Sequence, residues 1–313
     1  MGDRVVCRGC RSDLKGGPVD LVGPCVYING EFMLPSEAKI SVFDRGFLYG
    51  DGVFEGIRAY DGRIFRLDQH LERLFRGAKA IRLAVPLARD ELRNVILETV
   101  RRSGLKGAYV RLVVSRGSGD LGLDPRNCHT PAAVVVIVDS IALYPREVYE
   151  TGLDVITCVT RRNSPSALNP EVKSLNYLNN ILAKIEVGDA NAHEGLMINH
   201  AGFVAEATGD NVFICREGRI ITPPVNAGIL EGVTRQVVIE LAAEMGIPLA
   251  EDNLTVYQVY TSDECFLTGT AAEIVPVARV DGRVIGDGRP GPITKRLMAR
   301  FKEVTLTEGV PVP

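Results

Sequence analysis

The segment Asn169-Pro170-Glu171-Val172-Lys173-Ser174-Leu175-Asn176-Tyr177-Leu178-Asn179-Asn180 joins a loop to a predicted helix and places one lysine just before that helix. The helix is predicted from apolar residues that have the i, i+3, i+4, i+7 spacing of a buried face, namely Leu178, Ile181, Leu182 and Ile185. A lysine at such a junction is normally a solvated cation. Alternatively, the amine of Lys173 could condense with a carbonyl group, as a Schiff-base lysine does. The rest of the chain decides between these interpretations.

Length and composition indicate a globular chain rather than a nucleic-acid or membrane protein. The 313 residues suit about two domains, and 46% hydrophobic with 24% charged residues is ordinary for a globular protein. The net charge of −3 leaves no basic excess to neutralise phosphates. Apolar runs such as residues 132–138 are too short to span a bilayer, and residues 1–25 lack the apolar region of a secretory signal. We therefore expect a cytoplasmic protein with neither nucleic-acid nor membrane partners.

The seven cysteines indicate neither a disulfide framework nor a metal site. Cys7 and Cys10 form one Cys-x-x-Cys pair, but no second pair and no His-x3-5-His motif follow, so a zinc site would lack ligands. We expect no bound metal. Residues 1–24 are interpreted as a flexible N-terminal extension.

Hairpin and helix signals alternate in the first half of the chain. Asn29-Gly30 and Asp61-Gly62 lie between apolar runs and predict tight hairpin turns. Helices are predicted at 67–83 and at about 92–103, before a strand at 108–115. Alternation along that strand places three residues on one face: Tyr109, Arg111 and Val113.

The loop Gly117-Ser118-Gly119-Asp120-Leu121-Gly122 has the spacing of a dinucleotide-binding fingerprint. That fingerprint requires a helix after the glycines. Only residues 123–131 precede the next strand, and they contain Pro125 and Pro131. A parallel crossover needs about a dozen residues or more, usually helical. We reject the dinucleotide interpretation, while a glycine-rich loop that lines a site remains open.

Frequent hairpins with few helices between strands predict an α+β fold rather than a doubly wound sheet. The segment 141–151 contains Pro145 and is interpreted as an interdomain connection. We therefore expect a small α+β domain at 25–140 and a large α+β domain at 152–313 that contains Lys173.

If Lys173 forms a Schiff base, the cofactor that uses this chemistry most widely is pyridoxal 5'-phosphate. This cofactor needs an acid beside its pyridine nitrogen, and Glu206 lies in the otherwise apolar segment 203–208. An outward-facing strand residue is an equally good interpretation of Glu206. Tyr177, four residues after Lys173, could bond the cofactor's phenolic oxygen, or it could be a core or interface tyrosine.

The cofactor also needs a seat for its phosphate. The segment Gly232-Val233-Thr234 opens a predicted helix, whose free N–H groups attract anions. Gly269-Thr270 ends a predicted strand and could add a hydroxyl and amides, and Arg73 could supply a bidentate cation. Taken separately, these are a helix cap, a turn and a solvated arginine.

A substrate pocket would need apolar and carboxylate-binding side chains. Arg111 shares a strand face with Tyr109, and an isolated buried arginine is costly, so a surface charge is a poor interpretation of it. The candidates for this pocket are Tyr49, Phe54, Tyr109, Arg111 and Tyr144.

Three ordered motifs now give the chain a family resemblance: Lys173 with Asn176-Tyr177-Leu178-Asn179, then 228–235 (Gly-Ile-Leu-Glu-Gly-Val-Thr-Arg), then 268–274 (Thr-Gly-Thr-Ala-Ala-Glu-Ile). Together they resemble the class IV pyridoxal-phosphate-dependent aminotransferases. Val53-Phe54-Glu55-Gly56-Ile57-Arg58 and Tyr109-Val110-Arg111 look most like the branched-chain amino-acid aminotransferases. The resemblance implies a two-domain fold-type IV enzyme, similar in fold to D-amino-acid aminotransferase, that binds pyridoxal phosphate in its large domain and forms a homodimer or higher homo-oligomer.

The resemblance also implies roles for individual residues. Lys173 would be the Schiff base and proton shuttle, with Glu206 on the pyridine nitrogen and Tyr177 on the phenolic oxygen. The phosphate would be held by Arg73, Val233, Thr234 and Thr270, and Leu230 would pack on the ring. Tyr109, Thr270 and Ala271 would bind the substrate α-carboxylate. Arg111 would take the distal carboxylate of glutamate, and the apolar side-chain pocket would be lined by Tyr49, Phe54 and Tyr144.

The expected reaction transfers an amino group between a branched-chain L-amino acid (leucine, isoleucine or valine) and 2-oxoglutarate, giving the branched 2-oxo acid and L-glutamate. A D-amino-acid aminotransferase of this class would carry an Arg-x-His pair after the strand of Tyr109, whereas Arg126 and His129 here are separated by two residues. An (R)-amine transaminase or an aminodeoxychorismate lyase fits Tyr109-Val110-Arg111 less well. A non-catalytic protein on the same scaffold is disfavoured by the intact set of Lys173, Tyr177 and Glu206.

Overall fold

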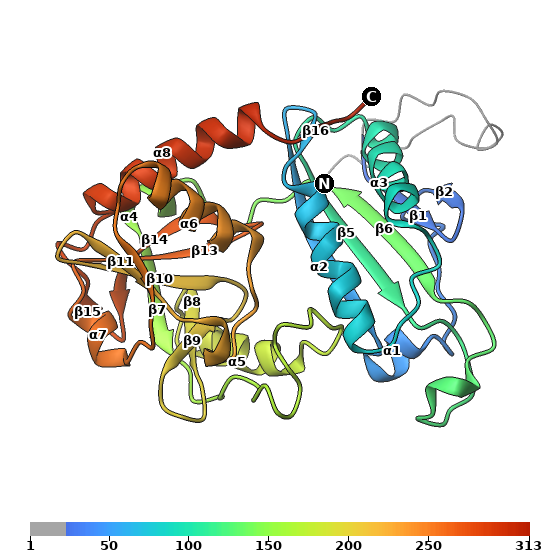
Figure 1. The fold of residues 1–313 in the computed structure, drawn as a ribbon, viewed down its shortest axis with the longest axis horizontal. Helices are drawn as coiled ribbons and strands as arrows, with labels where there is room; N and C mark the ends of the chain where they lie inside the picture. Colours follow the sequence, from blue (N-terminus) through green and yellow to red (C-terminus); the bar gives the residue numbers. More distant parts are fainter. Residues whose placement is uncertain (1–22) are drawn as a thin grey trace, which may run out of the picture.

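The structure of the protein is a computed structural model that describes residues 23–313. The proposed extension therefore lies almost wholly outside the described residues. Two β-sheets lie side by side, each with its own helices (Figure 1). The fold class expected from the sequence, a two-domain α+β fold, is confirmed.

The first sheet has the strand order β16-β4-β3-β5-β6-β1-β2. Its strands are β1 Cys25–Ile28, β2 Glu31–Met33, β3 Gly52–Tyr60, β4 Arg63–Ile64, β5 Ala108–Ser115, β6 Ala133–Asp139 and β16 Val310–Pro311. The helices of this half are α1 Arg45–Tyr49, α2 Leu67–Ala80, α3 Arg89–Ser103 and the 3-10 turn η1 Pro125–Asn127. The last strand of the chain, β16, pairs with β4, so the C-terminus returns to the first sheet.

The second sheet has the order β12-β11-β10-β13-β14-β7-β8-β9, with β15 paired to β14. Its strands are β7 Leu153–Thr157, β8 Glu194–Ile198, β9 Val204–Ala207, β10 Asn211–Arg216, β11 Arg219–Thr222, β12 Leu249–Glu251, β13 Glu264–Gly269, β14 Glu273–Val280 and β15 Arg283–Val284. Its helices are α4 Val148–Thr151, α5 Leu178–Asp189, α6 Val233–Glu244, α7 Val256–Tyr260, α8 Pro292–Thr307 and the 3-10 turn η2 Val225–Ala227.

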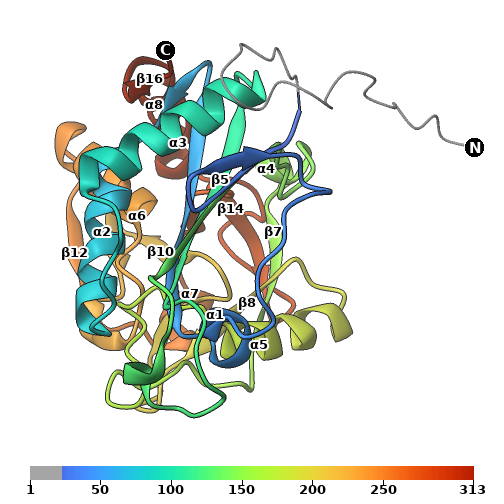
Figure 2. The same cartoon turned by 90° about the vertical axis from the view of Figure 1, so that its right-hand side faces the viewer.

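The core of the first half lies between its sheet and helices α2 and α3, which cover one face of the sheet (Figure 2). Alternation along β5 divides its side chains between two environments, as predicted. Val110, Leu112 and Val114 are fully buried against the helices, while the opposite face carries Tyr109 and Arg111. One face of the sheet therefore supplies stability, which leaves the other face free for a site.

The predicted turn chemistry is present. Asn29 and Gly30 both have positive φ, at 49° and 106°, as a tight hairpin turn requires, and the turn joins β1 to β2. Strands β5 and β6 pair antiparallel, so the loop 117–122 connects a hairpin and not a parallel crossover. Rejection of the dinucleotide fingerprint is thereby confirmed.

One helix differs from the expectation. Helix α5 forms, but the stripe predicted to be buried is exposed: Leu178 66%, Ile181 52%, Leu182 47% and Ile185 54%. Asn180, Ala183 and Val187 face the protein instead. The prediction of a buried face was wrong for the single chain, because periodicity identifies an apolar face but not what covers it.

Candidate active site

Lys173 is held against the first sheet by its own backbone. Its carbonyl oxygen accepts a hydrogen bond of 2.9 Å from the backbone N–H of Phe54, and the N–H of Leu175 donates to the carbonyl of Gly52 at 3.0 Å. The side-chain amine donates to the hydroxyl of Tyr177 at 3.0 Å. It also lies 4.6 Å from the centroid of the Phe54 ring. Lys173 is therefore a positioned amine and not a freely moving surface cation.

This amine opens into a cleft of about 580 Å³ between the two halves of the protein. Seven of the residues proposed from the sequence line it: Phe54, Tyr109, Arg111, Lys173, Tyr177, Thr270 and Ala271. They come from β3, β5, the segment before α5 and the turn after β13. Residues as much as 217 positions apart in sequence, from Phe54 to Ala271, thus share one cavity.

The wall contributed by the first sheet combines a cation with aromatic rings. The guanidinium of Arg111 lies 4.6 Å from the ring centroid of Phe54 and 5.6 Å from that of Tyr109. Burial raises the pKa of the Tyr109 hydroxyl above its usual value. A Cβ atom at Gly56 would lie only 2.2 Å from that hydroxyl oxygen, so a larger residue there would displace the Tyr109 side chain. This wall can accept both apolar groups and a carboxylate.

Glu206 lies buried on β9 with three donors around its carboxylate. Arg162 Nε donates at 2.8 Å, the backbone N–H of Leu230 at 2.9 Å and Asn211 Nδ2 at 3.1 Å. Burial raises the pKa of Glu206, and the charge of Arg162 opposes that rise. Sequence reasoning missed Arg162, because 44 residues separate it from Glu206.

Arg73 is buried on α2 beside the start of α6. Its Nη1 donates to the carbonyl oxygen of Glu231 at 2.8 Å, and Gly232 is the N-cap residue of α6. Val233 and Thr234 form the first turn of that helix, and Thr234 is buried. The interpretation of Arg73 as a solvated arginine is wrong, since the side chain is only 7% exposed.

Two of the proposed pocket residues do not line the cleft. The Tyr49 hydroxyl donates to the carbonyl of Leu121, on the glycine-rich loop. The Tyr144 hydroxyl lies 3.4 Å from Glu194 Oε2, and burial raises its pKa. Within a single chain, neither tyrosine is placed to contact a ligand beside Lys173.

A charged wall of the cleft was not anticipated from the sequence. Asp210, Glu194 and Lys184 line the side of the cleft formed by the second sheet and α5. Lys184 Nζ donates to Glu194 Oε2 at 2.7 Å. Burial and the neighbouring Glu194 raise the pKa of Asp210 to about 7. The segment Thr208-Gly209-Asp210 follows β9, so its position after the strand of Glu206 was the available signal.

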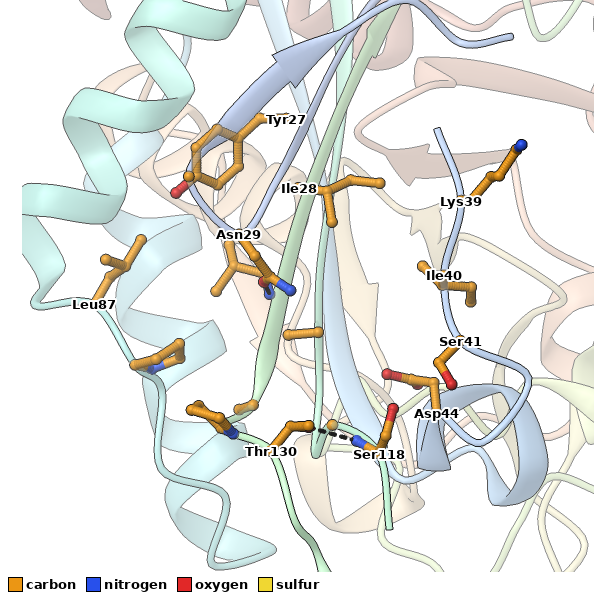
Figure 3. A pocket seen from close by; sticks show the side chains of 17 residues that line it. Tyr27, Ile28, Asn29, Lys39, Ile40, Ser41, Asp44, Leu87, Ser118 and Thr130 are labelled. Carbon is orange, nitrogen blue, oxygen red and sulfur yellow. Dashed lines mark hydrogen bonds between the residues drawn. The ribbon is translucent and has the colours of Figure 1, made fainter. Parts of the chain in front are cut away.

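Another cavity, of about 540 Å³, lies elsewhere on the first half (Figure 3). Tyr27, Asn29 and Leu87 line it together with Ile40, and the backbone N–H of Ser118 donates to Thr130 Oγ1 at its edge. None of the residues proposed to contact cofactor or substrate lines this cavity. The cleft at Lys173 is therefore the stronger candidate for chemistry.

Comparison with known proteins identifies the class. Residues 52–280 match the sequence model of the amino-transferase class IV family, and the chain belongs to that family. It is 50% identical over 287 residues to a Methanocaldococcus jannaschii protein assigned to the branched-chain-amino-acid aminotransferases, covering 92% of this chain and 98% of that protein. It is 34% identical over 281 residues to the branched-chain-amino-acid aminotransferase of Escherichia coli K12, covering 88% and 91%.

Solved structures give the same result. The branched-chain aminotransferase of the thermophilic archaeon Thermoproteus uzoniensis, solved with norvaline, superposes with a TM-score of 0.85 at 38% identity, covering 90% of this chain and 94% of that one. The Escherichia coli branched-chain enzyme gives 0.88 at 34% identity, with 90% and 95% covered. The family resemblance seen in the sequence is confirmed.

Two features are absent from residues 23–313. Across these residues, no helix is long and apolar enough to cross a membrane. Nor does this part of the chain contain a group of three or more His, Cys, Asp or Glu side chains arranged to hold a metal ion.

Proposed function

We propose that the protein is a pyridoxal-phosphate-dependent branched-chain-amino-acid aminotransferase that uses 2-oxoglutarate as amino acceptor. The observation that carries this proposal is the amine of Lys173, 3.0 Å from the Tyr177 hydroxyl, in a cleft that also presents Arg111. The names of the related proteins support the same substrate class.

The residues present fit the cofactor. Arg73 retains unused N–H groups beside the first turn of α6, which suits a phosphate. Glu206 is a buried carboxylate, which suits a pyridinium nitrogen, and Tyr177 is a donor already beside Lys173. When bound, pyridoxal phosphate supplies an electron sink that stabilises negative charge at the substrate Cα. Leu230, Val233, Thr234 and Thr270 complete the set proposed to contact it.

In the proposed mechanism, Lys173 would hold the cofactor through Nζ, and this amine would be free to move protons once substrate is bound. The freed Nζ then takes the proton from the substrate Cα as a general base and returns a proton as a general acid. Tyr109, Thr270 and Ala271 bind the α-carboxylate. Phe54 packs on the branched side chain, and Arg111 pairs with the distal carboxylate when glutamate occupies the same place.

The first experiment tests the lysine. Purified protein is expected to be yellow, and borohydride is expected to fix the chromophore on Lys173. Lys173→Ala should lose activity by about 1,000-fold or more, since general acid–base groups typically contribute factors of this size. Lys184→Ala, which removes another lysine of the cleft, should still give a fixed chromophore. A Lys173→Ala protein that transaminates normally would sink the mechanism.

The second part of this test addresses the substrate. With 2-oxoglutarate as acceptor, L-leucine is expected to react faster than D-alanine or (R)-1-phenylethylamine, and aminodeoxychorismate should not be cleaved. Preference for any of these three would assign the cleft to the corresponding rival activity on the same fold.

We also propose that the protein works as a homodimer in the cytoplasm. The exposed stripe on α5 supports association, because contiguous apolar patches on a protein surface mark interaction sites. Further exposed apolar side chains lie on the first half, at Phe47, Leu121 and Leu123. Ile181 belongs both to the stripe and to the lining of the cleft. A second copy on this surface would therefore cover Ile181 and close one side of the site.

A further inference from the structure

We propose that Glu55, which does not line the cleft, is the positioning residue that orients the Arg73 guanidinium for the cofactor phosphate. The inference rests on the proposed function, since it assumes that pyridoxal phosphate binds beside Arg73. It assigns a role to the acidic residue of the segment Val53-Phe54-Glu55-Gly56.

Strand β3 turns Glu55 away from the cleft. Phe54 and Gly56 line the cleft, so the residue between them points to the other face of the sheet, towards α2. There the Glu55 side chain is 0% exposed. Helix α2 presents His70 and Arg73 to it, three residues apart and hence on one helical face. A carboxylate at this position in the core needs partners, and both come from α2.

The contacts form a two-point fork. Arg73 Nε donates to Glu55 Oε1 at 2.7 Å, and Arg73 Nη2 donates to Oε2 at 2.6 Å. His70 Nδ1 lies 2.8 Å from the same Oε2. A bidentate guanidinium–carboxylate pair fixes the plane of the guanidinium as well as its distance. Glu55 of β3 thus sets the orientation of the Arg73 guanidinium.

The Arg73 guanidinium has enough N–H donors to bind one more anion. A guanidinium has five N–H groups. Two go to Glu55, and one on Nη1 goes to the carbonyl of Glu231. Two remain, one on each terminal nitrogen. Because Glu231 immediately precedes Gly232, the N-cap of α6, these two donors lie beside the free N–H groups of that helix. Glu55 holds one edge of the guanidinium and leaves the other for a phosphate.

The charges of Glu55, Arg73 and His70 indicate a phosphate site that depends on the direction of its N–H donors rather than on a strong positive charge. Burial alone would raise the pKa of Glu55, but Arg73 and His70 together lower it to about 2. Burial opposes the charge of Arg73, yet Glu55 keeps its pKa above the usual value. Burial lowers the pKa of His70, so the ring is neutral at neutral pH. The Glu55–Arg73 pair has no net charge, and a phosphate must be bound by aligned donors.

Charge and alignment predict opposite results for Glu55→Gln. The amide removes a negative charge near the phosphate, which alone would tighten binding. It also offers a donor where Arg73 needs an acceptor, so one of the two fork hydrogen bonds is lost and the guanidinium is released. We expect alignment to dominate. The dissociation constant of pyridoxal phosphate should rise about 10- to 100-fold in Glu55→Gln.

The experiment titrates cofactor-free protein with pyridoxal phosphate and follows absorbance. Glu264→Gln is the matched control, because Glu264 is also a buried carboxylate with several donors, beside the start of α8 and away from the cleft. It should lose stability and bind cofactor like wild type. The 31P resonance of the bound phosphate should shift in Glu55→Gln and not in Glu264→Gln. Equal or tighter cofactor binding by Glu55→Gln would overturn the positioning role.

A double-mutant cycle separates positioning from general destabilisation. If Glu55 acts through Arg73, then Glu55→Gln should change cofactor affinity by less than about 2-fold in an Arg73→Gln background. An additive loss would overturn the inference. If Glu55→Gln cannot be isolated in a folded state, Glu55→Asp decides, since it keeps the charge but withdraws it by one methylene group. Weakening of about 3-fold or more supports the role, and wild-type affinity contradicts it.

The two proposals fail in different ways. Wild-type protein that does not bind pyridoxal phosphate at all would refute the proposed function. Wild-type protein that binds, with Glu55→Gln unchanged, refutes only the role of Glu55.

Discussion

Helices α2 and α5 both carry an apolar stripe with helical periodicity, but of these two only α2 buries its stripe within the chain. Leu67, Leu71, Leu74 and Ala78 of α2 lie in the core at 0–2% exposure, whereas the stripe on α5 is about half exposed. The two regions also differ in the cations that they carry. Arg73 on α2 is buried and paired with Glu55, while Lys173 before α5 faces the cleft.

The two regions give their cations different environments. On helix α2 the Arg73 guanidinium has a fixed position, because the helix packs in the core and the Glu55 carboxylate accepts hydrogen bonds from Arg73. The segment before α5 leaves an amine facing the cleft, and the helix that follows it exposes an apolar surface. The second environment fits the role proposed for Lys173, and the first fits the role proposed for Arg73 at the phosphate.

The buried and exposed apolar stripes should differ most in what they contribute to stability. Leu71→Ala should lower the free energy of unfolding by about 2–5 kcal/mol, since it opens a cavity in a packed core. Ile185→Ala should cost well under about 1 kcal/mol within one chain. Chemical denaturation at several protein concentrations measures both values.

The control for this prediction is the oligomeric state. Ile185→Asp should fold and sediment as a smaller species than wild type, because a charge would be placed in the proposed interface. If Ile185→Ala proves as costly as Leu71→Ala in a monomeric protein, the stripe on α5 packs within the chain and the contrast between the helices disappears.

The sequence predicted local features well because their causes are local. The Asn29-Gly30 turn follows from the φ angles that these residues tolerate, and the alternating faces of β5 follow from strand geometry. The contact of Lys173 with Tyr177 joins residues only four positions apart. The family motifs directed attention to residues of one cleft, which seven of the proposed residues line.

Features that depend on distant partners were not predictable in the same way. Arg162 meets Glu206 across 44 residues, and Arg73 meets Glu55 across 18, so no spacing rule connects them. The burial of Arg73 depends on a strand and a helix packing together. The exposure of α5 shows the same limit, because an apolar stripe has the same spacing whether the chain or another molecule covers it.

Arg111 is a second cation that faces the cleft, unlike the paired Arg73. Arg111 lies over aromatic rings in the cleft, where a substrate carboxylate could replace water around it. Arg111→Ala should slow the half-reaction with 2-oxoglutarate about 10- to 100-fold, because a charge-assisted hydrogen bond is lost. The half-reaction with L-leucine should change by less than about 3-fold. Single-turnover absorbance measurements separate the two, and equal losses would make Arg111 structural.

The buried acids Glu55 and Asp210 should make the stability of the protein depend on pH in opposite ways. Glu55, facing α2, has its pKa lowered to about 2, so its stabilising contribution is complete above the unfolded value of 4.5 and is lost only as pH falls towards 2. Asp210, on the side of α5, has its pKa raised from 3.8 to about 7. Between these values the folded state holds a proton that the unfolded state has lost, so stability falls as pH rises from about 4 to 7.

Asp210→Asn should remove that decline. Between pH 5 and pH 8, the stability of the cofactor-free variant relative to wild type should improve by about 1 kcal/mol, less than the full shift implies because the cleft admits water. Glu55→Gln should show a constant deficit across the same range, since Glu55 remains ionised throughout. Denaturant midpoints at several pH values measure both. A pH-independent difference for Asp210→Asn would mean that Asp210 does not titrate between pH 5 and pH 8, and the contrast between the two acids would disappear.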